Sequence, residues 1–352
     1  MADRAVDRIG ISHDRFHRDG NEGEFERHVA LPNTETRRLK PVAHGGDLGE
    51  MRRRFPDAPL PWIDLSTGIN PVPYPVPDLP AEAWTRLPAH EEPRALIAAA
   101  ARRYDVDPAT VVAAPGTQAL IQLLPRLVPK GRVAILGPTY EEHEVSWRRQ
   151  GHDVSIVDTL PRDADVALLV NPDNPTGRLI APDDLRSTNG LLVVDEAFID
   201  FHPRSASVAG SGAVVLRSFG KTYGLAGLRL GFAIAPRAIA DRLRDELGPW
   251  AVPGPALEIG RRALLDDAWL AQTTMRLEAD SARLRQMLTA AGFALMGGTA
   301  LFVTAHHPDA ARLVERLGRA SIHVRSFARE PSWLRFGVPA GDVEFSRLAM
   351  AL

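Results

Sequence analysis

The stretch VVAAPGTQALIQLLPRLVPKGRVAILGP, Val111 to Pro138, decides the fold. A short apolar run, a segment of helical periodicity that begins at Thr117 and a second apolar run predict strand, helix and strand in succession. Further strands are predicted at 153–157, 165–172, 191–198, 213–219 and 228–235, and another helix at 93–104. Strands that alternate with helices predict right-handed crossovers and a mostly parallel sheet that is covered on both faces.

The flanking regions predict an N-terminal extension and a smaller second domain. Residues 1–40 mix charges of both signs with almost no apolar periodicity, so we expect a flexible extension. Residues 41–92 hold eight prolines between Phe55 and Pro80, which favours an extended surface arm that forms part of the small domain. The large domain is predicted over 93–252. A helical tract from 253 to about Gly292, followed by short strands and one helix, predicts an α+β small domain over 253–352.

Composition excludes several classes of function. The chain of 352 residues contains no Cys, which removes disulfides, thiolate metal sites and cysteine nucleophiles from consideration. Its 42 basic and 44 acidic residues create no field that would attract nucleic acid or an anionic membrane. We find neither a run of eighteen apolar residues nor a signal sequence. We therefore expect a soluble, cytoplasmic protein that binds a small molecule.

Polar residues follow several predicted strands at the point where each strand ends. The segment NPDNPTG follows 166–170, Asp195 ends another strand, Ser218 and Lys221 follow 213–216, and PGTQ opens the helix after 111–114. The carboxyl ends of strands in a parallel sheet are where functional groups gather. We expect these side chains to share one site. The segment Glu141 to Glu144 predicts no metal site, because consecutive positions on a helix do not converge on one point.

Lys221 admits three interpretations. A phosphate-binding P-loop would need a glycine five positions before Gly220, where Val215 stands. A solvated loop lysine is common for such a residue taken alone. A lysine that forms a Schiff base with pyridoxal phosphate needs a helix N-terminus and a guanidinium for the phosphate, and a buried carboxylate for the ring nitrogen. The amides after Gly116, together with Arg229 and Asp195, supply all of these groups, which favours the third interpretation.

Four sequence pieces together resemble a known family. The pattern Ser-x-x-Lys, an Arg eight residues after that lysine, NPDNPTG and VVDEAF resemble the fold-type I pyridoxal-phosphate enzymes of aminotransferase class I/II, near histidinol-phosphate aminotransferase. The resemblance covers about residues 60–340 and implies an α/β large domain with a mostly parallel sheet plus a smaller α+β domain. Within that branch, HGGDLGE and WIDLSTGINPVPYP resemble the threonine-phosphate decarboxylases of cobalamin (vitamin B12) biosynthesis.

The resemblance implies a role for each matching residue around pyridoxal 5'-phosphate. Lys221 carries the covalent link and moves protons, Asp195 pairs with the ring nitrogen, Asn174 binds the phenolic oxygen and Tyr140 lies against the ring. The cofactor phosphate is assigned to Gly116, Thr117, Gln118, Ser218 and Arg229.

The implied substrate residues are basic or polar. Arg335 matches the arginine that binds a substrate carboxylate in this family, and Arg325, His44 and Asn70 are further candidates. The chain departs from its relatives at two positions where they carry a tyrosine, because Phe198 and Leu87 stand there.

These matches imply an enzyme that acts as a homodimer on a phosphorylated amino acid. The hypothesis is decarboxylation of O-phospho-L-threonine to (R)-1-amino-2-propanol O-2-phosphate. The alternative is transamination of the histidinol-phosphate type with 2-oxoglutarate and glutamate. The sequence leaves both open, because the reaction depends on which bond of the substrate Cα stands perpendicular to the cofactor ring.

Overall fold

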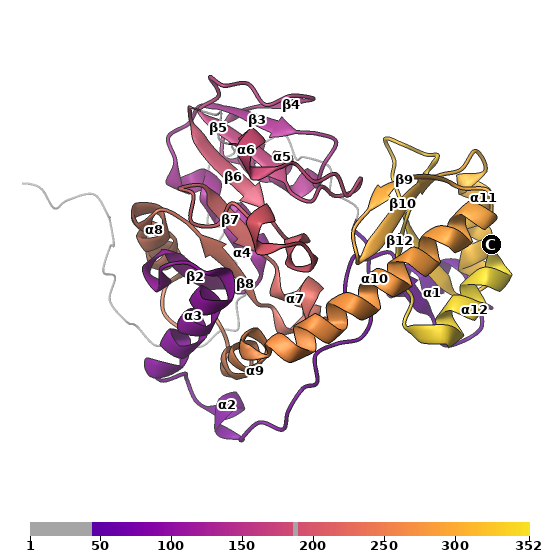
Figure 1. Ribbon diagram of the computed structural model, residues 1–352, viewed down its shortest axis with the longest axis horizontal. Coiled ribbons are helices and arrows are strands. Elements are labelled where there is room, and N and C mark those ends of the chain that lie inside the picture. The colour runs from indigo at the N-terminus through magenta and orange to yellow at the C-terminus, as the bar shows by residue number, and fades with distance from the viewer. Residues whose placement is uncertain (1–43, 186–188) are drawn as a thin grey trace, which may run out of the picture. The chain divides into compact units, whose positions relative to one another are not determined.

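Two β-sheets organise the residues described by the computed structural model, which are 44–185 and 189–352 (Figure 1). The expected flexible extension, residues 1–40, lies outside these residues. No helix in the described part of the chain combines the length and the apolar character needed to cross a membrane.

The larger sheet has seven strands in the order β2-β8-β7-β6-β5-β3-β4. Their bounds are β2 Val111–Ala114, β3 Arg132–Leu136, β4 Asp153–Val157, β5 Val166–Val170, β6 Leu191–Asp195, β7 Val214–Arg217 and β8 Gly231–Ile234. Neighbouring strands from β4 to β7 pair in parallel, and only β8 runs antiparallel to its neighbours β7 and β2. The prediction of a mostly parallel sheet is confirmed.

Helices lie on both faces of this sheet, which explains why its central strands are continuous apolar runs. Val193 and Val214 pack with α4 (Thr117–Leu127), α5 (Glu141–Arg149) and α8 (Arg237–Leu247). The adjacent residues Val194 and Val215 face the opposite side and pack with α3 (Glu91–Tyr104) and α9 (Gly254–Leu265). The shorter helices of this part are α2 Glu82–Thr85, α6 Pro182–Leu185 and α7 Phe219–Thr222, with 3-10 turns at Pro108–Thr110, Ile199–Phe201, Arg204–Ala206 and Ala226–Leu228.

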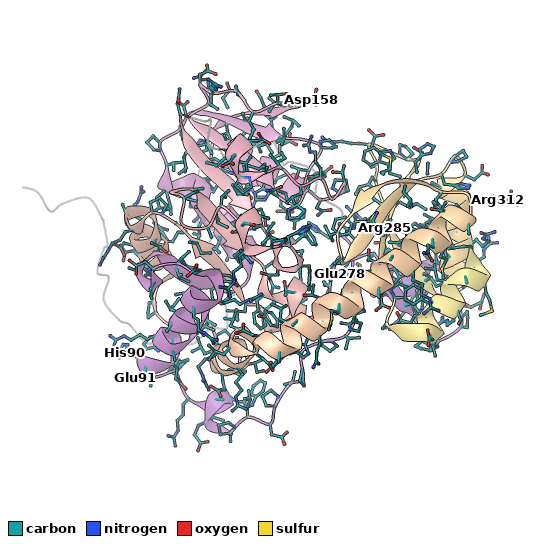
Figure 2. The ribbon with its side chains drawn as sticks, viewed as in Figure 1. His90, Glu91, Asp158, Glu278, Arg285 and Arg312 are labelled. Carbon is teal, nitrogen blue, oxygen red and sulfur yellow. The ribbon has the colours of Figure 1, made fainter. Side chains whose placement is uncertain are left out.

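The smaller sheet has five strands in the order β1-β11-β12-β10-β9. Their bounds are β1 Ile63–Leu65, β9 Ala294–Gly298, β10 Phe302–His306, β11 Ile322–Ser326 and β12 Trp333–Gly337. Its helices are α1 Leu48–Arg54, α10 Asp267–Ala290, α11 Ala310–Arg319 and α12 Gly341–Ala351. Figure 2 places Glu278 and Arg285 along α10, the long helix that follows α9. The structure thus contains the predicted smaller α+β part.

Three features of the structure differ from the organisation that the sequence pattern suggests. The helical tract that begins near 253 is two helices, because the Asp266 side chain accepts a hydrogen bond from the Trp269 amide and starts α10 anew. Residues of α9 pack in one core with α3 of the larger sheet rather than with the small domain. The proline-rich arm is also not wholly superficial, because Ile63 and Leu65 of β1 are buried and pair in parallel with β11.

We predict that the small core depends on the buried face of α10. Leu284 on this helix is fully buried, whereas Met275 on the same helix is 65% exposed. Leu284→Ala should lower the free energy of unfolding by about 2–5 kcal/mol because it leaves a cavity. Met275→Ala should change it by about 0.5 kcal/mol or less. Chemical denaturation measures both values, and equal losses would contradict this account of the core.

Candidate active site

The predicted site residues meet at the carboxyl ends of the central strands. A cavity of about 360 Å³ is lined by residues that follow β2, β5, β6 and β7, which is the size of a small-ligand site. All predicted site residues except Arg325 and Asn70 line it: His44, Gly116, Thr117, Gln118, Tyr140, Asn174, Asp195, Ser218, Lys221, Arg229 and Arg335.

Lys221 lies on α7, the single turn that follows β7. Its Nζ atom is 5.2 Å from the centroid of the Phe198 ring. Burial lowers the pKa of the Lys221 amine, Arg335 and Arg229 lower it further, and only Asp195 opposes them. A lowered pKa leaves a larger share of the amine neutral near pH 7, which is the form that attacks a carbonyl.

Asp195 is buried at the end of β6 and is held by two donors. Its Oδ1 accepts a hydrogen bond from the amide of Ala197 at 3.1 Å, and its Oδ2 lies 3.0 Å from Nε2 of His143. His143 is itself only 1% exposed and packs edge-on against Tyr140. With Asp195 ionised, the imidazole donates through Nε2, which fixes the carboxylate toward the cavity.

Sequence interpretation missed His143. The pattern of the segment Glu141 to Glu144 gives this residue no role, yet it follows Tyr140 by three positions in the first turn of α5. This helical spacing places positions 140 and 143 on the same side of α5, and it is the sequence signal that indicates a place for His143 beside Tyr140.

The first turn of α4 forms a cradle for an anion. Gly116 precedes this helix with φ +83°, and a Cβ at this position would lie 2.5 Å from Nη2 of Arg229. The first amides of an α-helix have no partners within the helix, so those of Thr117 and Gln118 can bind a phosphate beside the guanidinium. Gly116 is therefore required both for its backbone conformation and for the space that Arg229 occupies.

Tyr140 and Gln118 form one side of this cradle. The Tyr140 hydroxyl donates to Oε1 of Gln118 at 3.4 Å, and Nε2 of Gln118 donates to Glu142 at 2.8 Å. The other oxygen of Glu142 lies 3.1 Å from Nε2 of His44. Burial raises the pKa of Tyr140, and Glu142 and Asp195 raise it further, so its hydroxyl remains a hydrogen-bond donor.

Arg335 on β12 is a buried cation with an unused donor. Its Nη2 donates to the carbonyl of Ser66 at 2.7 Å and its Nη1 donates to Oδ1 of Asn174, but Nε has no hydrogen-bond partner in the described part of the chain. Burial lowers the pKa of Arg335 to about 10, and the nearby Arg325 adds to this. A buried guanidinium of this kind favours a bound anion.

Arg325 lies on β11 directly opposite Arg335 in the antiparallel register. Burial lowers its pKa as well. It lines an adjoining cavity of about 320 Å³, which shares His44, Tyr140, Asn174 and Arg335 with the first cavity. Two arginine side chains thus stand side by side, and Arg335 lines both cavities.

Asn70 is placed differently from the other predicted residues. Its buried amide donates to the carbonyl of Thr222 at 2.9 Å and accepts from Arg276 at 2.9 Å and from the Val72 amide at 3.1 Å. These contacts occupy its side chain within the protein. Asn70 therefore does not line the cavity, although the sequence analysis gives it as a candidate substrate residue.

The sequence model for aminotransferase class I and II matches residues 83–350. The chain belongs to this family. It is 44% identical over 328 residues to a threonine-phosphate decarboxylase of Sinorhizobium sp, covering 89% of this chain and 98% of the relative. A threonine-phosphate decarboxylase of Pseudomonas aeruginosa is 43% identical, with 88% of this chain and 97% of the relative covered.

A solved structure supports the fold. The histidinol-phosphate aminotransferase of Sinorhizobium meliloti, in complex with pyridoxal-5'-phosphate, superposes with a TM-score of 0.73 at 23% identity, covering 92% of this chain and 97% of the other. The expected fold of fold-type I enzymes is confirmed.

We predict that Gly116→Ala weakens the binding of pyridoxal phosphate at least about tenfold, since it strains the left-handed backbone and displaces the Arg229 guanidinium. Gly227→Ala is the matched control, because a Cβ there would meet no atom within 4 Å. Fluorescence titration of the cofactor-free protein measures both affinities. Unchanged affinity in Gly116→Ala would show that the cradle does not hold the cofactor phosphate.

We predict opposite pH shifts for two changes around Lys221. The Asp195 carboxylate raises the pKa of this amine and the Arg335 guanidinium lowers it. Asp195→Asn should therefore move the pH midpoint of Lys221 modification to lower values, and Arg335→Met should move it to higher values. Reductive methylation of the cofactor-free protein with formaldehyde, followed by peptide mass analysis, gives both midpoints. Shifts in the same direction would contradict the proposed charge balance.

Proposed function

We propose that this protein is a pyridoxal-phosphate-dependent decarboxylase that converts O-phospho-L-threonine to (R)-1-amino-2-propanol O-2-phosphate in cobalamin biosynthesis. The observation that carries the proposal is the cavity that Lys221, Asp195 and Arg335 line, together with Arg325, which stands opposite Arg335 and lines the adjoining cavity. Identity of 44% over nearly the whole length of a threonine-phosphate decarboxylase supports the same reaction.

The described residues fit the cofactor group by group. The amides of Thr117 and Gln118, with Ser218 and Arg229, would hold its phosphate, and Asp195 would hold its ring nitrogen in the protonated form. Tyr140 would lie against the ring. The Oδ1 atom of Asn174 is occupied by Arg335, which leaves its Nδ2 donor for the phenolic oxygen. Pyridoxal phosphate, when bound, supplies an aldehyde for attachment of an amine and a protonated ring that withdraws electrons from the substrate Cα.

Lys221 would serve as the proton carrier. Its lowered pKa makes the amine lose a proton more readily than an ordinary lysine, and its place in the cavity would bring it close to a substrate Cα. In decarboxylation it would deliver a proton to Cα after carbon dioxide has left. Phe198, which packs edge-on against Phe302, offers no hydroxyl on this side of the cavity.

The two arginines suit a short substrate with two anionic groups. Opposed residues of an antiparallel pair have their Cα atoms about 4.5–5.5 Å apart and point to the same face. O-Phospho-L-threonine carries its carboxylate and its phosphate on adjacent carbons, whereas histidinol phosphate carries a phosphate alone. We assign the carboxylate to Arg335 and the phosphate to Arg325, with His44 beside it.

We further propose that two copies of the chain form a homodimer. Three large apolar side chains near α2 and α9 are strongly exposed: Trp84 by 69%, Leu87 by 69% and Trp250 by 55%. Exposed apolar groups of this size are typical of protein interfaces. Leu87 stands where relatives place a tyrosine that reaches the partner's cofactor, so in this dimer position 87 would contribute apolar contact instead.

We predict that the purified protein, supplied with pyridoxal phosphate, releases carbon dioxide from O-phospho-L-threonine without any oxo acid. Arg335→Met should reduce kcat/KM about a hundredfold because a buried, charged substrate contact is lost, whereas Arg237→Met, an exposed arginine on α8, should not. Labelled carbon dioxide and product phosphate ester are measured together. Turnover that requires 2-oxoglutarate, with histidinol phosphate as the better substrate, would instead establish the aminotransferase.

A second measurement tests the covalent link at Lys221. Borohydride should trap pyridoxal phosphate covalently on Lys221, and Lys221→Ala should abolish both the adduct and the yellow colour of the protein. Lys130→Ala, which changes a lysine after α4, should leave both unchanged. An adduct that persists in Lys221→Ala would move the covalent link to another lysine.

A further inference from the structure

The turn that carries Lys221 cannot hold its own conformation. Helix α7 has four residues, and the amide of Tyr223 donates to the Phe219 carbonyl at 3.0 Å to close this single turn. A helix of this length is far below the length that is stable by itself. The position of the Lys221 amine therefore depends on contacts from outside the turn.

The proline-rich arm supplies one set of contacts. The backbone amide of Asn70 donates to the carbonyl of Lys221 at 2.9 Å, and its side-chain amide donates to the carbonyl of Thr222 at 2.9 Å. Arg276 of α10 donates to the Asn70 oxygen and fixes the orientation of that amide. Two consecutive carbonyl groups of the lysine turn are thus held by one buried residue.

A buried ion cluster supplies the second set of contacts. The hydroxyl of Thr222 donates to Oδ2 of Asp200 at 2.5 Å, and the other oxygen of Asp200 pairs with Arg217. Arg217 also donates to Glu196 at 3.1 Å and lies over the ring of Tyr104 at 4.4 Å. Burial alone would raise the pKa of Asp200, but Arg217 and the Thr222 hydroxyl bring it below its usual range, so the carboxylate stays ionised.

The cluster links the two loops that carry the reacting groups. Glu196 is the residue after Asp195, and Arg217 lies four positions before Lys221 at the end of β7. Glu196 also accepts hydrogen bonds from the Ser207 hydroxyl at 2.6 Å and from the Val208 amide at 2.8 Å. An ion pair between the residues next to Asp195 and before Lys221 fixes the distance between the two loops.

Stability does not explain why the cluster is ionic. A buried ion pair is often no more stabilising than apolar side chains of the same volume, but it restricts geometry because each partner must meet the other. The cluster's members Glu196, Arg217 and Thr222 are sequence neighbours of Asp195, Ser218 and Lys221, which line the cavity. We infer that Thr222, Asp200 and Arg217, together with Asn70, are positioning residues that set the Lys221 amine relative to Asp195. This inference rests on the proposed covalent link at Lys221.

The test removes one hydroxyl and leaves the charges in place. Thr222→Val keeps the shape of the side chain but loses the donor to Asp200, and Thr222→Ser keeps the donor. In the cofactor-free protein, Thr222→Val should slow the formation of the borohydride-trapped adduct at Lys221 about tenfold, since small misplacements of reacting groups reduce rates strongly. The value of kcat should fall by a similar factor with KM within about twofold, and Thr222→Ser should restore both.

Two controls separate positioning from general loss of stability. Thr289→Val removes the hydrogen bond from a hydroxyl to the Arg285 carbonyl on α10, far along the chain from the lysine. It should change neither the rate of adduct formation nor kcat. Leu284→Ala destabilises the small core without touching the lysine turn. If Leu284→Ala, at an equal fall in melting temperature, slows adduct formation as much as Thr222→Val, the inference is overturned.

The outcome for the unaltered protein distinguishes the two proposals. If it traps an adduct at Lys221 and Thr222→Val traps it equally fast, the positioning inference fails while the proposed function stands. If the unaltered protein traps no adduct there, the proposed function fails and this inference fails with it. Slow trapping in Thr222→Val with recovery in Thr222→Ser supports both.

Discussion

An imbalance of charge in one cavity governs the chemistry of this protein. Asp195 is the single acidic residue among the described residues that line the cavity, whereas Lys221, Arg229 and Arg335 all present cations to it. Too little negative charge beside a buried cation is costly, and the lowered pKa values of Lys221 and Arg335 reflect that cost. Ligands that bring a phosphate and a carboxylate would restore the balance. The same imbalance that favours anionic ligands also lowers the pKa of the Lys221 amine.

The parallel sheet is what allows so few residues to create this cavity. Asp195 and Lys221 follow β6 and β7, which are neighbours, and the loop that holds Asn174 follows β5 beside them. Parallel pairing brings these three strand ends to one edge of the sheet. Arg335 comes from the other sheet, and its contact with Asn174 joins the two parts of the site. The residues proposed to hold the cofactor thus follow strands of one sheet, whereas the two arginines Arg325 and Arg335 lie on strands of the other.

The sequence predicted the parts of the fold and site that depend on local pattern. The strands, helix α4 and the residues at strand ends follow from periodicity and from motif spacing. The pairing of His143 with Asp195 could not be predicted in the same way, because it joins residues 52 positions apart whose types alone suggest many partners. The prolines around β1 obscured its strand pattern in the sequence, and the strand forms because β11 offers it an unpaired edge. The break at Asp266 depends on a single cap, which apolar periodicity does not register.

Asp195, the last residue of β6, and Glu196, which follows it, connect the cavity with the ion cluster. Consecutive residues leave a strand in opposite directions, so Asp195 faces the cavity while Glu196 enters the cluster with Arg217. On the cavity side, the cationic side chains outnumber the Asp195 carboxylate and favour the binding of an anionic ligand. On the opposite side Glu196, Asp200 and Arg217 satisfy one another within the protein. A charged side chain that is already paired within the protein does not respond to ligand binding. The cluster of Glu196, Asp200 and Arg217 can therefore keep its geometry while the charged side chains that line the cavity change partners. A lysine proposed to bond to a cofactor and to move protons needs such fixed support, since its own turn is a helix of only four residues.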